Sequence, residues 1–120
     1  MTTVVFYKTN GIDYGFEDQG PTGGGEEGND VLCAARSSMT MLLINAIEVS
    51  YACDVEYTID EKTTDIRVIA KSALPAYEKD EKKQFAVSGL ISAYYFQLMD
   101  LLEDYYDFLD VKEIERDPEK

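Results

Sequence analysis

The residue with the clearest capacity for chemistry in this chain is Cys33, in the stretch NDVLCAARSS at residues 29–38. It follows a glycine-rich run, GPTGGGEEG, at the point where an apolar helical pattern begins. A thiol nucleophile usually takes its base from histidine, and the chain contains no histidine. Cys33 is therefore either a thiol that reacts without histidine or a small apolar residue packed in a core.

The glycine-rich run fits two other kinds of site poorly. A phosphate-binding loop would show the pattern GxxxxGK[ST], but this run holds no lysine, and Glu26 and Glu27 would repel phosphate. A metal site built from Glu26, Glu27 and Asp30 has suitable hard ligands, but its spacing matches no known loop. Without histidine, a zinc site is not supported either. We therefore expect a solvated acidic loop that holds no metal and no cofactor.

The position of Cys33 in its helix decides how reactive the thiol is. If the helix begins near Asn29 or Asp30, whose side chains can cap it, Cys33 lies in the first turn. Free backbone N–H groups there favour a thiolate. The carboxylate of Asp30 has the opposite effect, because a nearby negative charge favours the neutral thiol. From spacing alone, a structural and a nucleophilic role both remain open.

Length and charge limit the kinds of protein this can be. The chain has 120 residues, which fits one domain, expected over residues 1–115 with a frayed tail at 116–120. Its formal net charge of -13 opposes direct nucleic-acid binding, and either attracts a basic partner or only aids solubility. We expect no signal peptide and no membrane-spanning stretch. A cytoplasmic protein with two reduced cysteines is the default.

Local patterns predict the elements that must position Cys33. Residues 2–9 read as a strand, Asn10-Gly11 as a hairpin turn, and residues 12–18 as the returning strand, with Ile12, Tyr14 and Phe16 on its buried face. Residues 19–28 read as a mobile loop. The further expected elements are a helix at 31–49, a half-buried strand at 51–60, a returning strand at 65–71, a helix at 80–106 and a short edge strand at 108–114.

The order ββαββα predicts an α/β fold of the α+β type. We expect a two-layer domain, with an antiparallel four-stranded sheet and two helices on one face. The last helix carries apolar residues beyond a single stripe, among them Phe85, Tyr95, Phe96 and Met99. Such surplus apolar surface usually marks an interface.

The residues around Cys33 resemble the signature of the ribosomal-processing cysteine protease family. In that family G-H-A is followed by a short glycine-containing loop and then by G-x-D-[IV]-[VL]-C-A-[AG]-x-S. Gly20 matches the glycine before the histidine, and Gly28 and Asp30 match G-x-D without a gap. The remaining matches are Val31, Leu32, Cys33, Ala34, Ala35 and Ser37. The element order and the long final helix extend the resemblance over nearly the whole chain.

The resemblance implies a cytoplasmic, homodimeric cysteine protease that removes an N-terminal extension from a large-subunit ribosomal protein. Its partner would be this extension of a basic ribosomal protein, without cofactor, metal, nucleic acid or membrane. Cys33 would be the nucleophile, with Asp30 and Ser37 supporting its turn. The implied substrate-binding residues, in a loop that orders over the peptide, are Gly20, Pro21, Gly23, Gly24, Gly25 and Gly28.

One position departs from the family pattern, because the catalytic histidine falls on Pro21. Proline can neither take nor give a proton, and general-base help is worth roughly 10²–10⁴-fold, so the family mechanism should be badly impaired. A thiol is the nucleophile that depends least on a base. Two hypotheses follow: a slow or differently assisted protease, or a catalytically inactive homologue that binds peptides or acts in assembly.

Overall fold

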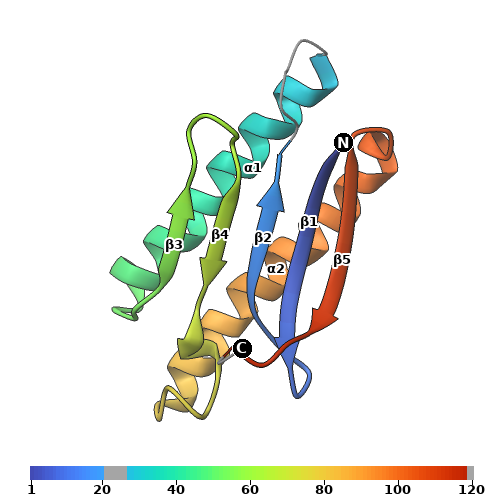
Figure 1. Cartoon of the computed structure of the whole chain (residues 1–120). Coiled ribbons are helices and arrows are strands. Elements are labelled where there is room, and N and C mark those ends of the chain that lie inside the picture. The colour runs from blue at the N-terminus through green and yellow to red at the C-terminus, as the bar shows by residue number, and fades with distance from the viewer. Residues whose placement is uncertain (21–26, 119–120) are drawn as a thin grey trace.

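The computed structural model describes residues 1–20 and 27–118, without the side chains of residues 27–30. The two long helices, α1 (Glu27–Asn45) and α2 (Glu81–Tyr105), cover one face of a sheet and leave its other face open (Figure 1). The strands are β1 (Thr2–Thr9), β2 (Ile12–Gln19), β3 (Glu56–Ile59), β4 (Ile66–Ile69) and β5 (Leu109–Glu115). Two short helices, η1 (Ala46–Ser50) and η2 (Lys71–Ala73), complete the described elements. The predicted two-layer α/β class is confirmed.

The first hairpin forms where its turn residues place it. Asn10 and Gly11 both have positive φ values, 52° and 78°, as a two-residue hairpin turn requires. β1 and β2 then pair antiparallel, with Phe6 opposite Phe16 and a register shift after Tyr7. This hairpin lies at the centre of the sheet and carries the chain to Gly20, directly before the glycine-rich segment.

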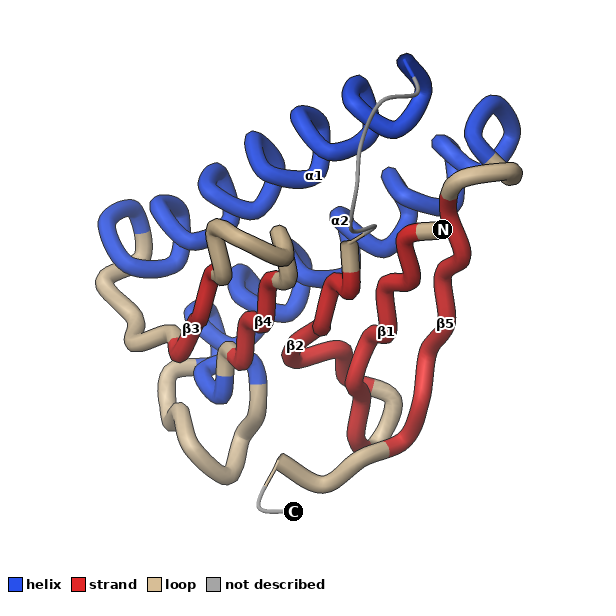
Figure 2. The backbone as a smooth tube through the Cα atoms, turned by 45° about the horizontal axis from the view of Figure 1, so that its top comes forward, coloured by secondary structure: helices blue, strands red, loops and turns tan. Residues whose placement is uncertain are grey.

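The sheet has five strands in the order β3-β4-β2-β1-β5, not the four antiparallel strands expected from sequence. β5 pairs parallel with β1, with Thr2 opposite Leu109, and the two strands run side by side (Figure 2). Parallel neighbours need a long connection, and here the chain between β1 and β5 includes both α1 and α2. Hairpin signals in the sequence report only antiparallel neighbours, so this pairing was not predicted.

The core lies between the helix layer and the sheet. Phe6 packs against Phe16, Tyr94 and Tyr95, with ring centroids 5.2–5.7 Å apart. On α2 the buried residues repeat at helical spacing, as predicted. They are Val87, Ile91, Tyr94 and Leu98. Leu43 and Ile44 on α1 and Ile47 on η1 are buried in the core, whereas Leu42 is exposed.

The edge strand β3 differs from its prediction in length and burial. It begins at Glu56, so Cys53 lies before the strand, although its side chain is buried. Tyr57 and Ile59 pair with the buried residues Val68 and Ile66 and share their face, but they remain 44% and 43% exposed. Alternation predicts which residues share a face, and only position in the sheet decides whether that face is covered.

By length and mean hydropathy alone, two helical segments could cross a membrane, Val31–Ser50 and Glu81–Tyr105. This differs from the sequence-based expectation that no stretch is long enough. Both segments pack against the sheet and contribute buried side chains to its core, which is the place of core helices in a two-layer domain.

Candidate active site

The helix that carries Cys33 begins earlier than predicted. α1 starts at Glu27, so Asn29 and Asp30 lie inside the helix and do not cap it. A glutamate in the first turn suits the positive end of a helix dipole, which is consistent with this early start. Cys33 is the seventh residue of the helix and belongs to its second turn. The predicted stabilisation of a thiolate by free N–H groups of the first turn is therefore wrong.

A different group meets the sulfur of Cys33. Arg36 lies three residues further along the same helix face, and its Nη2 donates a hydrogen bond to Cys33 Sγ at 3.3 Å. Cys33 is partly exposed and forms no disulfide, whereas Arg36 is fully buried. A guanidinium stays protonated in proteins and has only hydrogen-bond donors. Arg36 can therefore orient the sulfur but cannot take its proton.

Arg36 is held by residues from two other elements. Its Nη1 donates to Asp18 Oδ2 on β2 at 3.2 Å, and the two side chains are 2% and 0% exposed. The hydroxyl of Tyr94 on α2 donates to the same carboxylate oxygen at 3.1 Å. A buried ion pair is tolerated when further hydrogen bonds accompany it. Asp18, Arg36 and Tyr94 thus form a network that joins β2, α1 and α2 beneath Cys33.

Burial dominates the electrostatics of this network. It raises the pKa of Asp18 to about 6, although Arg36 and the hydroxyl of Tyr94 both act to lower it. Burial, and next the charge of Asp18, raise the pKa of Tyr94 well above its ordinary value. Within the described residues, Asp18 Oδ1 and Arg36 Nε have no hydrogen-bond partner. The network is therefore costly to bury, and Arg36 has little freedom to leave it.

Gly20 lies directly against this network at the end of β2. Its N–H donates to Asp65 Oδ1 at 3.1 Å. A Cβ atom at Gly20 would clash with Thr64 Oγ1 and would lie 3.1 Å from Arg36 Nη2. A side chain at this position would therefore displace either the β3–β4 turn or Arg36. The structure thus brings Gly20 and Cys33, two residues singled out from sequence, to the same guanidinium nitrogen, Arg36 Nη2.

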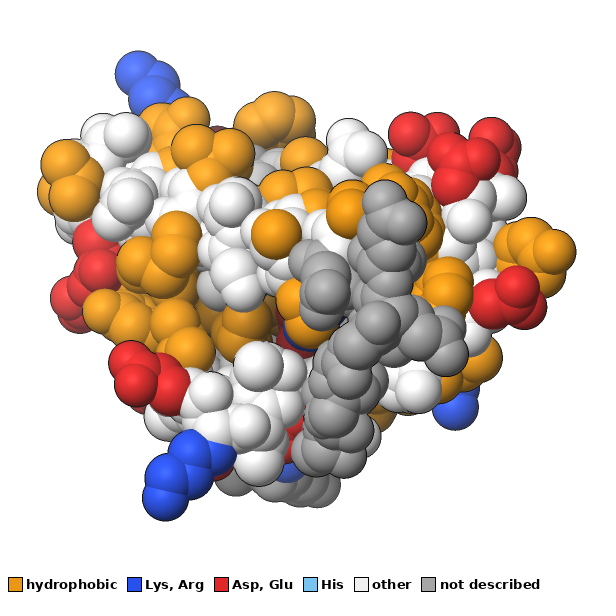
Figure 3. Space-filling view, turned by 90° about the horizontal axis from the view of Figure 1, so that it is seen from above, with side chains coloured by type: hydrophobic (Ala, Val, Ile, Leu, Met, Phe, Trp, Pro, Cys, Tyr) orange, Lys and Arg blue, Asp and Glu red, His pale blue; other side chains and the backbone are white. Residues whose placement is uncertain are grey.

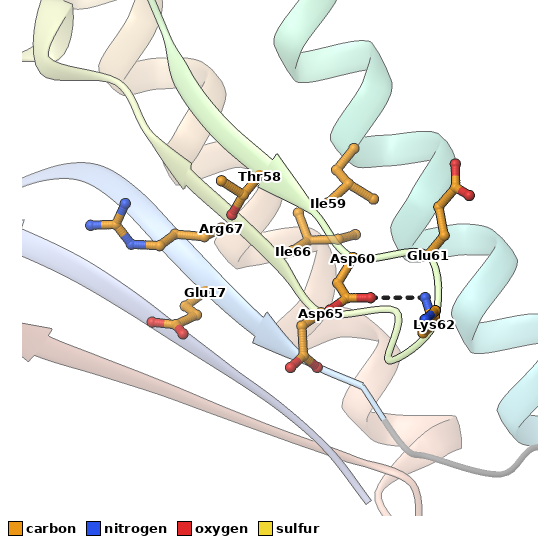
Figure 4. A pocket seen from close by; sticks show the side chains of 9 residues that line it. All are labelled: Glu17, Thr58, Ile59, Asp60, Glu61, Lys62, Asp65, Ile66 and Arg67. Carbon is orange, nitrogen blue, oxygen red and sulfur yellow. Dashed lines mark hydrogen bonds between the residues drawn. The ribbon is translucent and has the colours of Figure 1, made fainter.

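An open hollow of about 750 Å³ lies beside this point, lined by β3, β4, the turn between them and Glu17 (Figure 4). Asp60 accepts hydrogen bonds from the N–H groups of Lys62, at 2.9 Å, and Thr63, so its carboxylate holds the turn in shape. Asp65 holds the end of β2, as described above. The lining does not include Cys33.

The remaining residues expected at the site are placed less closely. Ser37 is exposed, one turn of α1 after Cys33. Gly28 and Asp30 lie in the first turn of α1, where the side chain of Asp30 is not described. Four positions of the expected substrate-binding loop lie outside the described residues, together with the carboxylate of Glu26. These four are Pro21, Gly23, Gly24 and Gly25.

Sequence reasoning missed Asp18, Arg36 and Tyr94 as parts of the site, although each carries a signal. Arg36 is the only charged residue between Asp30 and Glu48, and it follows the buried Leu32 by one turn. A lone charge on a buried stripe requires a partner. Asp18 continues the alternation that buries Phe16, so it extends the buried face of β2. Tyr94 lies on the buried stripe of α2, so its spacing indicates a core residue and not a member of the site.

A two-layer α/β domain with a partly exposed cysteine near the start of its first helix fits the class of cysteine peptidases. The family model of the cysteine protease Prp matches residues 1–110, and the chain belongs to this family. No curated protein matches the chain significantly.

Solved structures of similar fold cover nearly the whole chain. SMU.848 from Streptococcus mutans is 31% identical, with a TM-score of 0.77, over 97% of this chain and 99% of that chain. The essential ribosomal processing protease Prp from S. aureus, in complex with a substrate peptide, is 16% identical with a TM-score of 0.77, over 95% and 100%. The same protease with a covalently linked product peptide gives a TM-score of 0.74 at 16% identity. The S. aureus structures establish likeness of fold.

Proposed function

We propose that this chain binds a peptide segment of a basic protein beside Cys33, and that it lacks the base-assisted hydrolysis of its family. The observation that carries this proposal is the pairing of Cys33 with Arg36 in a chain without histidine. Family membership favours retention of the peptide-binding site, and the missing base argues against efficient hydrolysis of the bound peptide.

Hydrolysis of a peptide bond by a thiol needs two proton transfers. A base takes the proton of the thiol, and an acid later protonates the amine that leaves. Arg36 cannot serve as the base, because a guanidinium stays protonated in proteins. The pKa of Asp18 is raised to about 6, but its carboxylate accepts a hydrogen bond from Arg36, and Arg36 in turn contacts the sulfur. Asp18 therefore has no direct contact with the thiol. Binding without efficient turnover is the function that these groups support best.

The proposed ligand is the N-terminal extension of a basic large-subunit ribosomal protein, by analogy with the family. The charge of -13 supports a basic ligand. Lysine and arginine side chains are few on the face seen from above, and they lie toward its margin (Figure 3). Asp30 and Ser37 would support the turn that carries Cys33. The proposed ligand-contacting residues are Gly20, Pro21, Gly23, Gly24, Gly25 and Gly28.

The proposal includes a homodimer in the cytoplasm, without metal, cofactor, nucleic acid or membrane contact. A second candidate function is slow proteolysis. It is favoured by the hydrogen bond from Arg36, because a cation beside a sulfur supports the thiolate that attacks a carbonyl.

Binding can be tested with a fluorescent peptide that spans the extension and the first residues of the mature ribosomal protein of the source organism. We expect fluorescence anisotropy to show saturable binding to the wild type and to Cys33→Ala alike, because the thiol is not needed for recognition. A scrambled peptide of the same composition controls for simple charge attraction, and mass spectrometry of the mixture reports cleavage. Equal affinity for both peptides, or no binding, would contradict the proposal.

A further inference from the structure

Arg36 occupies the one position that the family signature leaves free between C-A-[AG] and serine. It is nevertheless the residue that contacts the sulfur of Cys33, at 3.3 Å. The fixed residues of the signature therefore do not account for the surroundings of this cysteine. The partner of the sulfur thus stands at a position that the signature does not specify.

We propose that Arg36 is a positioning residue for Cys33, which it orients and stabilises as a thiolate. Its two terminal nitrogens point in different directions, Nη1 to the carboxylate of Asp18 and Nη2 to the sulfur. The planar fork of a guanidinium can hold two acceptors at once, which a lysine ammonium on a flexible stem does less well. Asp18 acts one step further away, because it holds Arg36 and does not touch Cys33, whereas Tyr94 donates to Asp18 and not to Arg36.

Burial is what makes this contact effective. Arg36 and Asp18 are both shielded from water, so the guanidinium cannot turn into solvent without leaving a buried carboxylate unpaired. The cation therefore stays beside the sulfur, where its attraction to an anion is weakly screened. Cys33 itself is partly exposed, so reagents can reach the sulfur that Arg36 holds.

A purely structural role for Arg36 leads to a different expectation. In that case the Asp18–Arg36 pair would serve only the packing of β2 against α1, and the ionisation of Cys33 would not depend on it. The inference goes beyond the proposed function and does not require peptide binding. The rate of alkylation depends on the sulfur of Cys33 and not on peptide binding. A failure of the role inferred for Arg36 can therefore be told apart from a failure of the proposed function.

The test is the rate of alkylation of Cys33 by iodoacetamide as a function of pH, followed by peptide mass spectrometry on the folded protein. Cys53, which is buried and donates to the carbonyl of Tyr51, serves as the internal reference. Removing Arg36 alone would leave Asp18 buried and unpaired, so the main variant combines Arg36→Met with Asp18→Asn. Loss of the cation beside the sulfur should lower the rate of alkylation of Cys33 near neutral pH roughly tenfold.

Two further variants keep the test decisive. Tyr94→Phe leaves both contacts of Arg36 in place, so its profile should superimpose on that of the wild type. Arg36→Lys keeps a charge that can pair with Asp18 but loses the fork, so its profile should lie between the two. If the double variant does not fold, Arg36→Lys decides alone. A double-variant or lysine profile identical to the wild type, or an equal shift in Tyr94→Phe, would overturn the inference.

Discussion

At the scale of single residues, Gly20, like Gly15, is a described position where an added side chain would clash. A methyl group there would meet Thr64 and approach Arg36, and the β3–β4 turn or the guanidinium would have to move. We predict that Gly20→Ala lowers the free energy of unfolding by about 1–3 kcal/mol, the usual cost of overpacking. Thermal and denaturant unfolding measure this change.

Gly89 provides the matched control for this substitution. It lies exposed on α2, and an added Cβ would meet nothing within 4 Å. Gly89→Ala should therefore stabilise the protein by roughly 0.5–1 kcal/mol through helix propensity alone. Equal effects of the two substitutions would contradict the close packing described for Gly20.

The sequence predicts individual site residues only where a motif or a periodicity marks them. Cys33 and Gly20 were found through the spacing of a family signature. Arg36 was overlooked because its partner Asp18 lies 18 positions away in the chain, and no local pattern joins the two. Tyr94, which donates to Asp18, is 76 positions from that aspartate. Hydrogen bonds that link buried side chains of three elements can be identified only in the folded structure.

At the scale of elements, local signals decided what could be predicted. The first hairpin was predicted well, because Asn10 and Gly11 supply the turn conformation from within the segment itself. The end of the chain was predicted as an edge strand, but its parallel pairing with β1 depends on the path through α2. The predicted start of α1 was too late, because Asn29 and Asp30 have the side chains of cap residues although the helix begins at Glu27.

The three strands β1, β2 and β5 meet in a cluster of ionisable groups. Asp13 on β2 lies beside Glu113 on β5, which pairs with Lys8 on β1 at 3.0 Å. Burial, and next the neighbouring carboxyl group of Glu113, raise the pKa of Asp13 to about 6. The pKa of Glu113 is lowered, chiefly by its hydrogen bond with Lys8.

The direction of these shifts predicts how stability depends on pH. A carboxyl group whose pKa is raised in the folded state favours folding while it is protonated, and this contribution is lost as the pH rises through about 6. We expect the melting temperature to fall between about pH 5 and pH 7. Asp13→Asn should flatten this profile without abolishing it, because Asp18 shifts in the same direction. An unchanged slope in Asp13→Asn would show that Asp13 does not titrate with folding.

At the scale of the whole molecule, the helix layer presents apolar surface on its outer side. Phe85 is 82% exposed and Phe96 65% exposed on α2, and Leu42 is 66% exposed on α1. These side chains support the proposed homodimer, because large exposed apolar patches mark interfaces. Two chains of net charge -13 repel each other, so moderate salt should strengthen the association by screening.

Sedimentation equilibrium at micromolar concentration tests the dimer. We predict twice the mass of the chain for the wild type and a shift toward the monomer for Phe96→Lys, with an unchanged melting temperature in the monomer. Thr58→Lys, a substitution at an exposed position on the edge strand β3, controls for the added charge. A wild-type monomer in moderate salt would exclude the dimer.

The central claim is that the chain retains the family's site at Cys33 and lacks only its base, and Pro21→His tests this most directly. The measurement is kcat/KM for cleavage of the ribosomal extension peptide by the wild type, by Pro21→His, and by Pro21→His combined with Cys33→Ala. The histidine restores a base at the family's spacing from Cys33, so the single variant should cleave faster than the wild type by roughly 10²–10⁴-fold. The added Cys33→Ala should abolish that gain. Cleavage by the wild type at the rate of the histidine variant would contradict the claim, because another group would then supply the base.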